Sequence, residues 1–330
     1  MAVQAIDGPT GALSAAATIG THGSIRSIAF APGTAEPRTL FVGVSFYDRP
    51  GSAIVQYSVD AGRALTRVGE QTTPAVAVSL AAHPNGRFLY AALDSQSPSP
   101  RAPMIATYAL DAARRPSLLG AIDLPLFNVS EIVLSPSARH LVVASPATNA
   151  AAVYSIDASS GALTPAAGSP FEMPGAFAVA FHPAGRLLFT DDARRRIIWA
   201  HRVDPVSGVI GSRTGVTAGS LLVDLDVSED GRFLFGADLT GDVIWRLAID
   251  EVAGALTVLG SPGPSTEGPA ELARAGRFLY MTNRPNGFTA AAPTSFVFGY
   301  ATSEGALTLL PGFPVRPEPV GCPGKLALSN

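Results

Sequence analysis

A basic residue recurs seven times at nearly even spacing along this chain, each time just after a turn and before a short apolar run. The seven residues are Arg38, Arg87, Arg139, Arg186, Arg232, Arg277 and Lys325. The intervals between them are 49, 52, 47, 46, 45 and 48 residues. A period of this length is typical of propellers and solenoids, in which every repeat is one supersecondary unit. The period therefore restricts the fold before any single side chain is considered.

Each repeat contains two hairpins. Residues 178–189 and 225–235 each read as an apolar run, a turn ending in Gly and a second apolar run. This pattern predicts two antiparallel strands and a tight turn, because Gly accepts the positive φ that the turn requires. A second hairpin surrounds residues 157–161, where an alternating strand ends in Asp and a polar stretch with Gly follows. With four antiparallel strands per unit and no helix, we expect an all-β, seven-bladed β-propeller.

The two ends of the chain are predicted to complete the last blade together. Residues 3–7 and 13–19 read as the third and fourth strands of a unit, and residues 325–330 read as a second strand. Six complete units lie between them, so we expect the N- and C-terminal strands to pair and close the ring. Closure would leave no sheet edge open to aggregation. Since no linker interrupts the period, we expect one propeller domain over residues 1–330.

Composition and charge exclude several classes of partner. The net charge of −3 argues against nucleic-acid binding, which depends on a basic surface. No run approaches the ~18 apolar residues of a membrane span, and no signal peptide is recognisable at the start. The single cysteine, Cys322, cannot form an internal disulfide. We expect a cytoplasmic monomer whose partner is a small-molecule substrate.

The repeat sequence resembles a known family of propellers. The resemblance rests on His-Pro-x-Gly-Arg and the apolar residues after it (83–90 and 182–189), on Tyr-x-Ile-Asp with Gly-Ala-Leu-Thr (154–164) and on Gly-Ser-Pro-Phe (168–171). The chain resembles, over its whole length, the lactonase-like seven-bladed propellers. That family includes propeller-type 6-phosphogluconolactonases, carboxy-muconate lactonizing enzymes and relatives with YVTN repeats. The resemblance implies a lactonase-like enzyme, although these motifs mainly form turns and packing contacts.

The same resemblance draws attention to residues 177–197. Family members usually carry a His before a first strand and a Pro-Asp-Leu-Gly-like stretch ending in Arg after the second. Here Phe177 stands in the place of the His, and residues 191–196 replace the second stretch. Asp191 and Arg196 are the two residues that match, so the resemblance implies that Asp191 binds substrate and that Arg196 takes part in catalysis.

Acidic residues occur early in three first strands, where most repeats carry small residues. These residues are Glu131, Asp224, Asp226 and Glu271, the last with a register that the sequence leaves open by one residue. In a propeller the first strands line the central channel, and a carboxylate there is costly unless it meets water, a cation or a basic partner. One interpretation is that the four converge as a general base or a divalent-cation site. The other is that they bond neighbouring backbone amides or hold water.

Basic and aromatic residues near the same channel mouth are candidates for binding substrate. Arg26 on a first strand and Arg194 and Arg196 on a loop can hold a carboxylate or phosphate with a planar guanidinium. His22 lies in a loop before the first inner strand, and its ordinary pKa near neutrality suits a general base. Phe127 and Phe171 are predicted to form an apolar wall of the pocket or, alternatively, to cap blades.

Three classes of function fit these residues. The first is a lactonase-like hydrolase that opens a small, anionic cyclic ester in the channel mouth, with a carboxylate or His22 activating water. The second is a ring-forming lyase or isomerase acting on a small organic acid with similar groups. The third is a non-catalytic propeller that binds a ligand or a protein, since a scaffold does not determine its chemistry. No cofactor-binding motif is present, and the channel carboxylates are the candidate site for a divalent cation.

Overall fold

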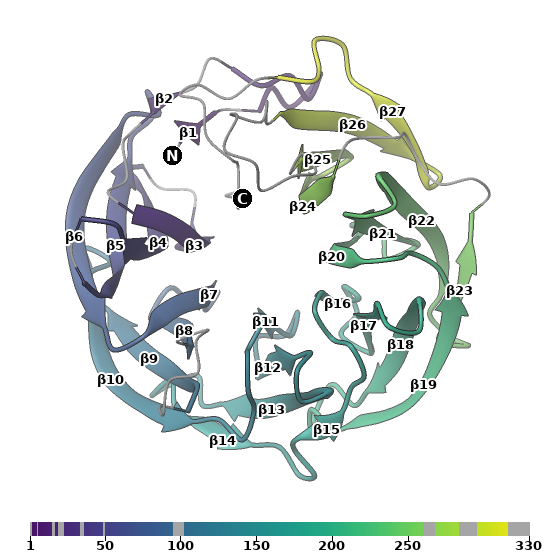
Figure 1. Cartoon of the computed structure of the whole chain (residues 1–330). Coiled ribbons are helices and arrows are strands. Elements are labelled where there is room, and N and C mark those ends of the chain that lie inside the picture. The colour runs from purple at the N-terminus through teal and green to yellow at the C-terminus, as the bar shows by residue number, and fades with distance from the viewer. Residues whose placement is uncertain are drawn as a thin grey trace. The chain divides into compact units, whose positions relative to one another are not determined.

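The chain folds into β-strands joined by turns (Figure 1). The computed structural model describes residues 2–4, 6–14, 17–18, 23–33, 36–48, 50–94, 102–259, 268–283 and 296–315. Within these residues no helix is long and apolar enough to cross a membrane. The prediction of an all-β fold is confirmed.

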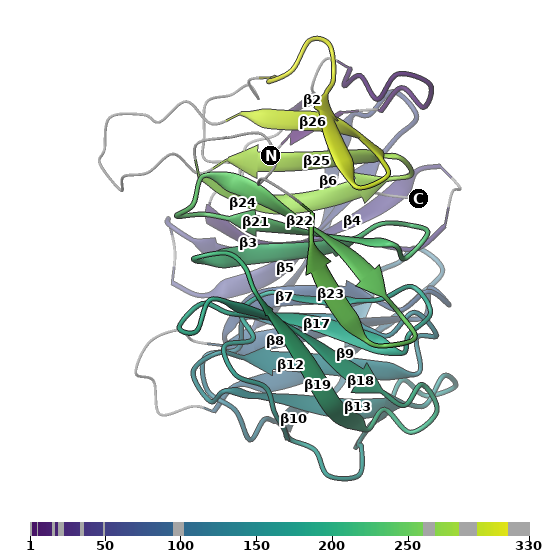
Figure 2. The ribbon, with the colours of Figure 1, turned by 90° about the vertical axis from the view of Figure 1, so that its right-hand side faces the viewer.

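Four antiparallel strands in sequence order make up each blade. In one blade the order is β24 (Pro269–Ala275), β25 (Phe278–Asn283), β26 (Val297–Ser303) and β27 (Ala306–Leu309). Figure 2 shows β24, β25 and β26 lying beside one another in this sheet. The fold is an all-β propeller of four-stranded antiparallel blades, as the two hairpins per repeat predict.

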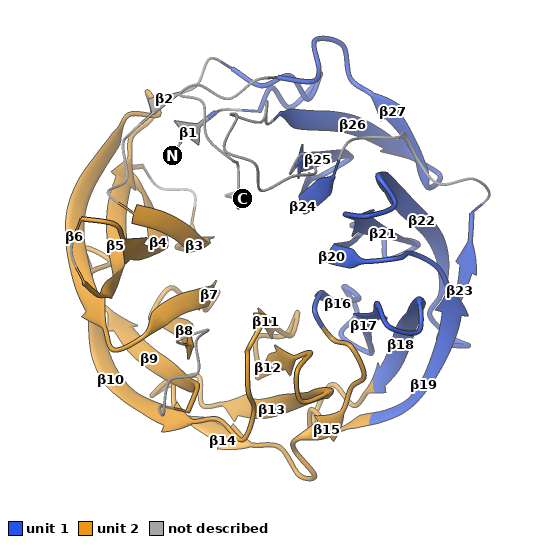
Figure 3. Ribbon diagram, viewed as in Figure 1, with its two compact units in different colours: residues 1–19, 177–202, 211–328 blue, residues 20–176, 203–210, 329–330 orange. Residues whose placement is uncertain are grey.

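The chain divides into two compact units, which Figure 3 distinguishes by colour. Unit 1 comprises Met1–Ile19, Phe177–Arg202 and Gly211–Leu328, and unit 2 comprises Gly20–Ala176, Val203–Ile210 and Ser329–Asn330. The single domain over residues 1–330 stays a prediction.

Unit 2 contains three blades. The first has β3 (Gly23–Phe30), β4 (Arg38–Phe46), β5 (Ser52–Val59) and β6 (Leu65–Thr73). The second has β7 (Val76–Ala82), β8 (Phe88–Asp94), β9 (Met104–Leu110) and β10 (Pro116–Asp123). The third has β11 (Glu131–Leu134), β12 (His140–Ser145), β13 (Ala150–Ile156) and β14 (Leu163–Pro165), with β15 (Phe171–Glu172) as an extra strand on β13.

Unit 1 contains three further blades and a short sheet. Its blades are β16 (Val179–Phe181), β17 (Leu187–Asp192), β18 (Ile197–Val203) and β19 (Ile210–Thr217), then β20 (Leu222–Val227), β21 (Phe233–Asp238), β22 (Val243–Asp250) and β23 (Ala255–Val258), and then β24–β27. The turn between β18 and β19 is assigned to unit 2. The short sheet pairs β1 (Ala2–Val3) with β2 (Ala17–Thr18).

The apolar core lies between neighbouring blades within each unit. In unit 2, Phe41, Leu89 and Tyr108 pack into one cluster that joins the first two blades. In unit 1, Leu187 and Leu234 belong to a cluster that joins the blades of β16–β19 and β20–β23. The second strand of a blade is covered on both faces, so β8 is buried along its whole length. This is why the second strands read as continuous apolar runs rather than alternating ones.

Two of the periodic arginines, Arg87 and Arg232, connect their blades to the outer hairpin of the next blade. In unit 2, Arg87 Nη2 donates to the carbonyl oxygen of Ser159 at 2.9 Å, and its guanidinium lies 5.3 Å from the centre of the Phe88 ring. The Tyr90 hydroxyl donates to the carbonyl oxygen of Gly161 at 3.2 Å. Gly161 has φ +75°, and a Cβ there would lie 2.6 Å from the Phe88 ring. The glycine of this turn is thus required both by its backbone conformation and by the close approach.

The N-terminal hairpin docks on β25 through the same contacts. Arg277 Nη2 donates to the carbonyl oxygen of Pro9 at 2.6 Å, and the Tyr280 hydroxyl donates to that of Gly11 at 2.8 Å. Gly11 has φ +72°, and a Cβ there would lie 2.6 Å from the ring of Phe278. An Ile6–Leu13 bridge closes this hairpin. The first residues of the chain therefore contact β25 as an outer hairpin contacts the blade before it.

The number of blades differs from the sequence prediction. The described residues form six blades, not the seven that the period predicts. Among the described residues, the N-terminal segment pairs through β1 with β2 and through the Ile6–Leu13 bridge, so it contributes a short sheet rather than a seventh four-stranded blade. Residues 325–330, which were expected to join these strands and close the last blade, lie outside the described residues.

Candidate functional site

Strand register places the acidic residues of three first strands at one position of the repeat. Each of Glu131, Asp224 and Glu271 faces the fifth residue of the second strand in its own blade. The pairs are Glu131 with Ala144, Asp224 with Ala237, and Glu271 with Thr282. The register of Glu271, which the sequence left open, is thereby defined. The same position holds serine in the first two blades, where Ser27 faces Gly43 and Ser79 faces Ala92.

A β-bulge comes directly before this position in four of the blades. The register shifts between Ile25 and Ser27, between Ala77 and Ser79, between Leu222 and Asp224, and between Pro269 and Glu271. Such bulges bend a strand and redirect its side chains, and they are frequent beside functional sites. Alternation of apolar residues gives no sign of them, so the sequence prediction missed them.

The Asp224 carboxylate is bonded to backbone amides. Its Oδ2 accepts a hydrogen bond from the N–H of Leu272 on β24 at 2.7 Å, and its Oδ1 accepts one from the N–H of Leu225 at 2.8 Å. In unit 2 the Ser79 hydroxyl takes the corresponding role and accepts from the N–H of Ile132 at 3.2 Å. Asp224 therefore joins two first strands, which supports the second interpretation of this acid, in which it binds neighbouring amides.

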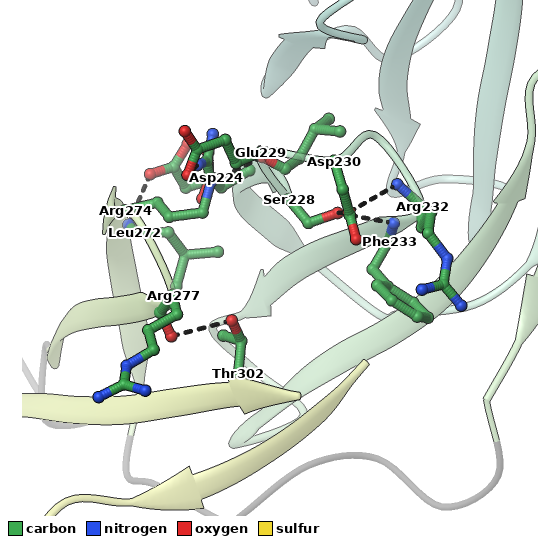
Figure 4. Close-up of polar contacts among 12 residues, drawn as sticks. Asp224, Ser228, Glu229, Asp230, Arg232, Phe233, Leu272, Arg274, Arg277 and Thr302 are labelled. Carbon is green, nitrogen blue, oxygen red and sulfur yellow. Dashed lines mark hydrogen bonds and ion pairs between the residues drawn. The ribbon is translucent and has the colours of Figure 1, made fainter. Parts of the chain in front are cut away.

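Asp226 lies two residues further along β20 and forms an ion pair with Arg274 of β24. The Arg274 Nε lies 3.3 Å from Asp226 Oδ2, and its N–H donates to the carbonyl oxygen of Val227 at 2.8 Å. Arg274 Nη1 also lies 4.0 Å from Glu229 Oε2. Figure 4 shows Arg274 close to Asp224 and Glu229. We call Asp226 and Arg274 the first-strand pair.

The first-strand pair is partly buried. Asp226 keeps 24% of its side-chain surface and Arg274 keeps 21%, whereas Asp226 Oδ2 itself is buried and has no hydrogen-bond partner among the described residues. Burial raises the pKa of Asp226 to about 6, although the charge of Arg274 acts to lower it. A carboxylate with a pKa near neutrality and an accessible edge can exchange protons with a bound molecule at physiological pH.

The first-strand pair is a departure from the repeat. The residues that occupy the position of Asp226 in the other blades are Ala29, Ala81, Val133, Ala180 and Ala273. Those at the position of Arg274 are Phe30, Ala82, Leu134, Phe181 and Val227. Both positions are thus apolar in every other blade. Sequence reasoning missed Arg274, and aligning the ends of the first strands would have found it as the only charge there.

Asp191 lies on the second strand of its blade, beside the loop that enters β16. Its Oδ1 accepts hydrogen bonds from the N–H groups of Phe177 and Ala178, both at 2.9 Å. The residue is 1% exposed, and Oδ2 has no hydrogen-bond partner among the described residues. Burial raises the pKa of Asp191 to about 6. Its visible role is to hold the start of β16, while the predicted role in binding substrate stays a prediction.

Arg194 and Arg196 lie in the exposed turn between β17 and β18. Arg196 has φ +58°, and its Nε donates to the carbonyl oxygen of Gly219 at 3.2 Å. Its own carbonyl oxygen accepts from the N–H of Ala218 at 2.9 Å. Arg196 therefore fastens the loop that leads to β20, and no described contact joins it to Asp226.

The remaining predicted residues belong to unit 2 or lie outside the description. Arg26 occupies the bulge of β3 and is half-buried. Phe127 is 68% exposed in the loop before β11, and Phe171 lies on β15, where it pairs with Ala151 of a third strand. His22 lies outside the described residues. The described residues contain no group of three His, Cys, Asp or Glu side chains that could hold a metal ion.

Solved structures resemble this chain over nearly its whole length. A candidate 6-phosphogluconolactonase of Bacteroides fragilis matches with a TM-score of 0.77 at 15% identity, over 96% of this chain and 91% of the other. One of Bacteroides uniformis matches with a TM-score of 0.76 at 14% identity, over 93% and 90%. The periplasmic gluconolactonase of Pseudomonas aeruginosa matches with a TM-score of 0.73 at 18% identity, over 94% and 90%.

These similarities show the propeller fold. Neither a protein-family model nor a curated protein sequence matches the chain. The chemistry of the site must therefore be argued from the residues described above.

Proposed function

We propose that this protein is a lactonase-like hydrolase that opens a small cyclic ester beside the first strands β20 and β24. The observation that carries the proposal is the first-strand pair, in which a partly buried carboxylate and a guanidinium lie 3.3 Å apart. The names of the solved relatives and the sequence resemblance to lactonase-like propellers support the same class of reaction.

In the proposed reaction Asp226 acts as the general base. It takes a proton from a water molecule as the water oxygen bonds to the carbonyl carbon of the lactone. The tetrahedral intermediate then collapses, the bond between the carbonyl carbon and the ring oxygen breaks, and that oxygen receives the proton from Asp226. Water is the co-substrate and an open-chain hydroxy acid is the product. Since the base must be ionised, we expect kcat/KM to rise with pH through about 6, the pKa of Asp226.

The charges around the site bear on the substrate. Four carboxylates lie on β20, on β24 and in the turn after β20: Asp224, Asp226, Glu229 and Glu271. Arg274 contributes the guanidinium in this group. An anion brought to this place meets more negative than positive charge. We therefore propose an uncharged lactone as the better substrate, and the anionic ester expected from the sequence becomes the comparison.

The test is a hydrolysis assay with glucono-1,5-lactone and its 6-phosphate, measured by base uptake at constant pH after subtracting spontaneous hydrolysis. We expect the uncharged lactone to be hydrolysed faster, and Asp226→Asn to lower kcat about 100-fold, the usual contribution of a general base. Asp123→Asn, at an exposed aspartate on the outer strand β10, is the matched control and should retain the rate.

Two results would overturn the proposal. One is a wild-type rate equal to that of spontaneous hydrolysis, and the other is a folded Asp226→Asn protein with the wild-type rate. Raised thermal stability in the presence of a lactone without turnover would instead favour the non-catalytic binding propeller.

A further inference from the structure

Arg274 has contacts that suit it to control a neighbouring carboxylate. Its Nε–H is directed at the carbonyl oxygen of Val227, the residue that follows Asp226, so the guanidinium is fixed to β20 by a hydrogen bond of 2.8 Å. From this anchored position Nε lies 3.3 Å from Asp226 Oδ2. Because the N–H is already directed at the backbone, the contact with Asp226 is an ion pair whose strength depends on charge.

We propose that Arg274 is a positioning residue for Asp226, holding its carboxylate on β20 and setting the pH range in which it can accept a proton. This inference rests on the proposed function, because it assigns Asp226 the role of base. It adds a residue that acts through Asp226 rather than on the substrate.

The other blades show that the fold does not require this pair. Alanine or valine stands at the position of Asp226 in all five, and an apolar residue stands at the position of Arg274. Asp226 and Arg274 stand at successive positions of the repeat in neighbouring blades and contact each other, and neither charge is needed to make a blade. A partly buried ion pair is seldom a net gain in stability over apolar residues, so a functional role explains its presence better.

The charged groups that face Asp226 come from few elements. Its own strand contributes Asp224, β24 contributes Glu271 and Arg274, and the turn after β20 contributes Glu229 through Arg274. β16 carries no titratable residue, and β21 carries only Asp238 at its far end. β17, which also contacts β20, carries Asp191 and Asp192 at its end and no cation. On β16, β20, β21 and β24 the only cation is Arg274. Its removal should therefore change the electrostatic environment of Asp226 more than any other single substitution.

Burial and Arg274 act on Asp226 in opposite directions. Without the guanidinium, the carboxylate loses the one opposite charge that the described residues place beside it and should hold its proton to higher pH. Glu229 has the contrary effect, because it partly neutralises Arg274 from 4.0 Å. Removing the Glu229 charge should therefore move the titration of Asp226 to lower pH.

The experiment combines a pH–rate profile with a direct titration. In Arg274→Gln we expect the acid limb of kcat/KM for glucono-1,5-lactone to move up by about one pH unit. In Arg274→Lys, which keeps the charge, most of that shift should be absent. Glu229→Gln should move the limb the opposite way by a smaller amount. Arg232→Gln, which removes an arginine from an exposed ion pair with Glu304, is the control and should leave the limb in place.

The titration of Asp226 itself is followed by carbon NMR of 13C-labelled aspartate carboxyls, with Asp226→Asn identifying its resonance. The inference is overturned if the titration midpoint of Asp226 in folded Arg274→Gln equals that of the wild type. It is also overturned if the midpoint shifts while the pH–rate profile stays unchanged. If Arg274→Gln does not fold, Arg274→Lys and Glu229→Gln decide by the same measurements. A moved titration in a protein without lactonase activity means that the ion pair controls Asp226 while the proposed function fails.

Discussion

The side chain of Asp191 makes the stability of this fold depend on pH. Its Oδ1 is satisfied by two backbone N–H groups, but its Oδ2 is buried, and the carboxyl has a pKa of about 6. An aspartate in the unfolded chain has a pKa of 3.8. Between these two values the folded chain keeps a proton that the unfolded chain has released. Asp191 therefore makes the protein less stable as pH rises through this interval.

We expect Asp191→Asn to remove this penalty. The amide oxygen can still accept from the N–H groups of Phe177 and Ala178, and no charge is buried at neutral pH. The free energy of unfolding at pH 7 should rise by about 1 to 3 kcal/mol, and its fall between pH 4 and 6 should become shallower. Urea unfolding at several pH values measures the free energy of unfolding and its dependence on pH. The slope that remains belongs to groups such as Asp226, and an unchanged slope would contradict this account.

At the level of elements, an outer hairpin is fastened to the preceding blade by a tyrosine, an arginine and a glycine turn. The Tyr280 hydroxyl holds the N-terminal hairpin and the Tyr90 hydroxyl holds the turn of the third blade in unit 2. Both hydroxyls are buried. The two hairpins thus offer a matched comparison within one molecule.

Tyr280→Phe should lower the free energy of unfolding by about 1 kcal/mol, because the buried carbonyl oxygen of Gly11 loses its donor. Hydrogen exchange should accelerate in residues 7–13. Tyr90→Phe should cost a similar amount but accelerate exchange in residues 157–162 instead. Equal exchange patterns in the two variants would show that the hairpins do not open independently.

The strands and their order could be predicted from the sequence, whereas the details of the site could not. Alternation and glycine turns determine the blades. The periodic Arg87, Arg232 and Arg277 are accounted for by their contacts with the next hairpin, as for Arg87 and Ser159. The bulge before Asp224 was not predictable, because a single extra residue leaves the apolar pattern almost unchanged. Nor was the ion pair of Asp226 and Arg274, since it joins residues 48 positions apart whose contact depends on how two sheets pack.

On the scale of the whole molecule, the N-terminal hairpin completes the packing of the last described blade. The N-terminal hairpin covers a cluster in which Phe278, Tyr280 and Leu310 are buried, with Ile6 and Leu13 packed against them. The described residues form six blades, and the blade that contains β25 is the last of them. The N-terminal hairpin covers the surface of β25 that a further blade would otherwise cover. The first residues of the chain therefore contribute to the core of unit 1.

Deleting residues 1–14 should expose that cluster. We expect a loss of about 3 kcal/mol or more in the free energy of unfolding, since burying each large apolar side chain contributes about 1.5 to 3 kcal/mol. Increased binding of the dye ANS and a lower Tm would report the exposed surface. Deleting only residues 1–5 leaves the Ile6–Leu13 bridge in place and should have a much smaller effect. Equal stability of the two truncated proteins would exclude this role for the hairpin.

Equivalent positions in other blades make the first-strand pair transferable. In unit 2, Ala29 on β3 and Ala82 on β7 occupy the places that Asp226 and Arg274 hold, and both are half-buried. Substituting aspartate and arginine there would recreate the same juxtaposition on a scaffold that has no such chemistry at that point. Because the blades repeat one structure, the apolar positions of a second blade pair can receive the same acid–base pair. The substituted pair can then be compared with Asp226 and Arg274 in the same protein.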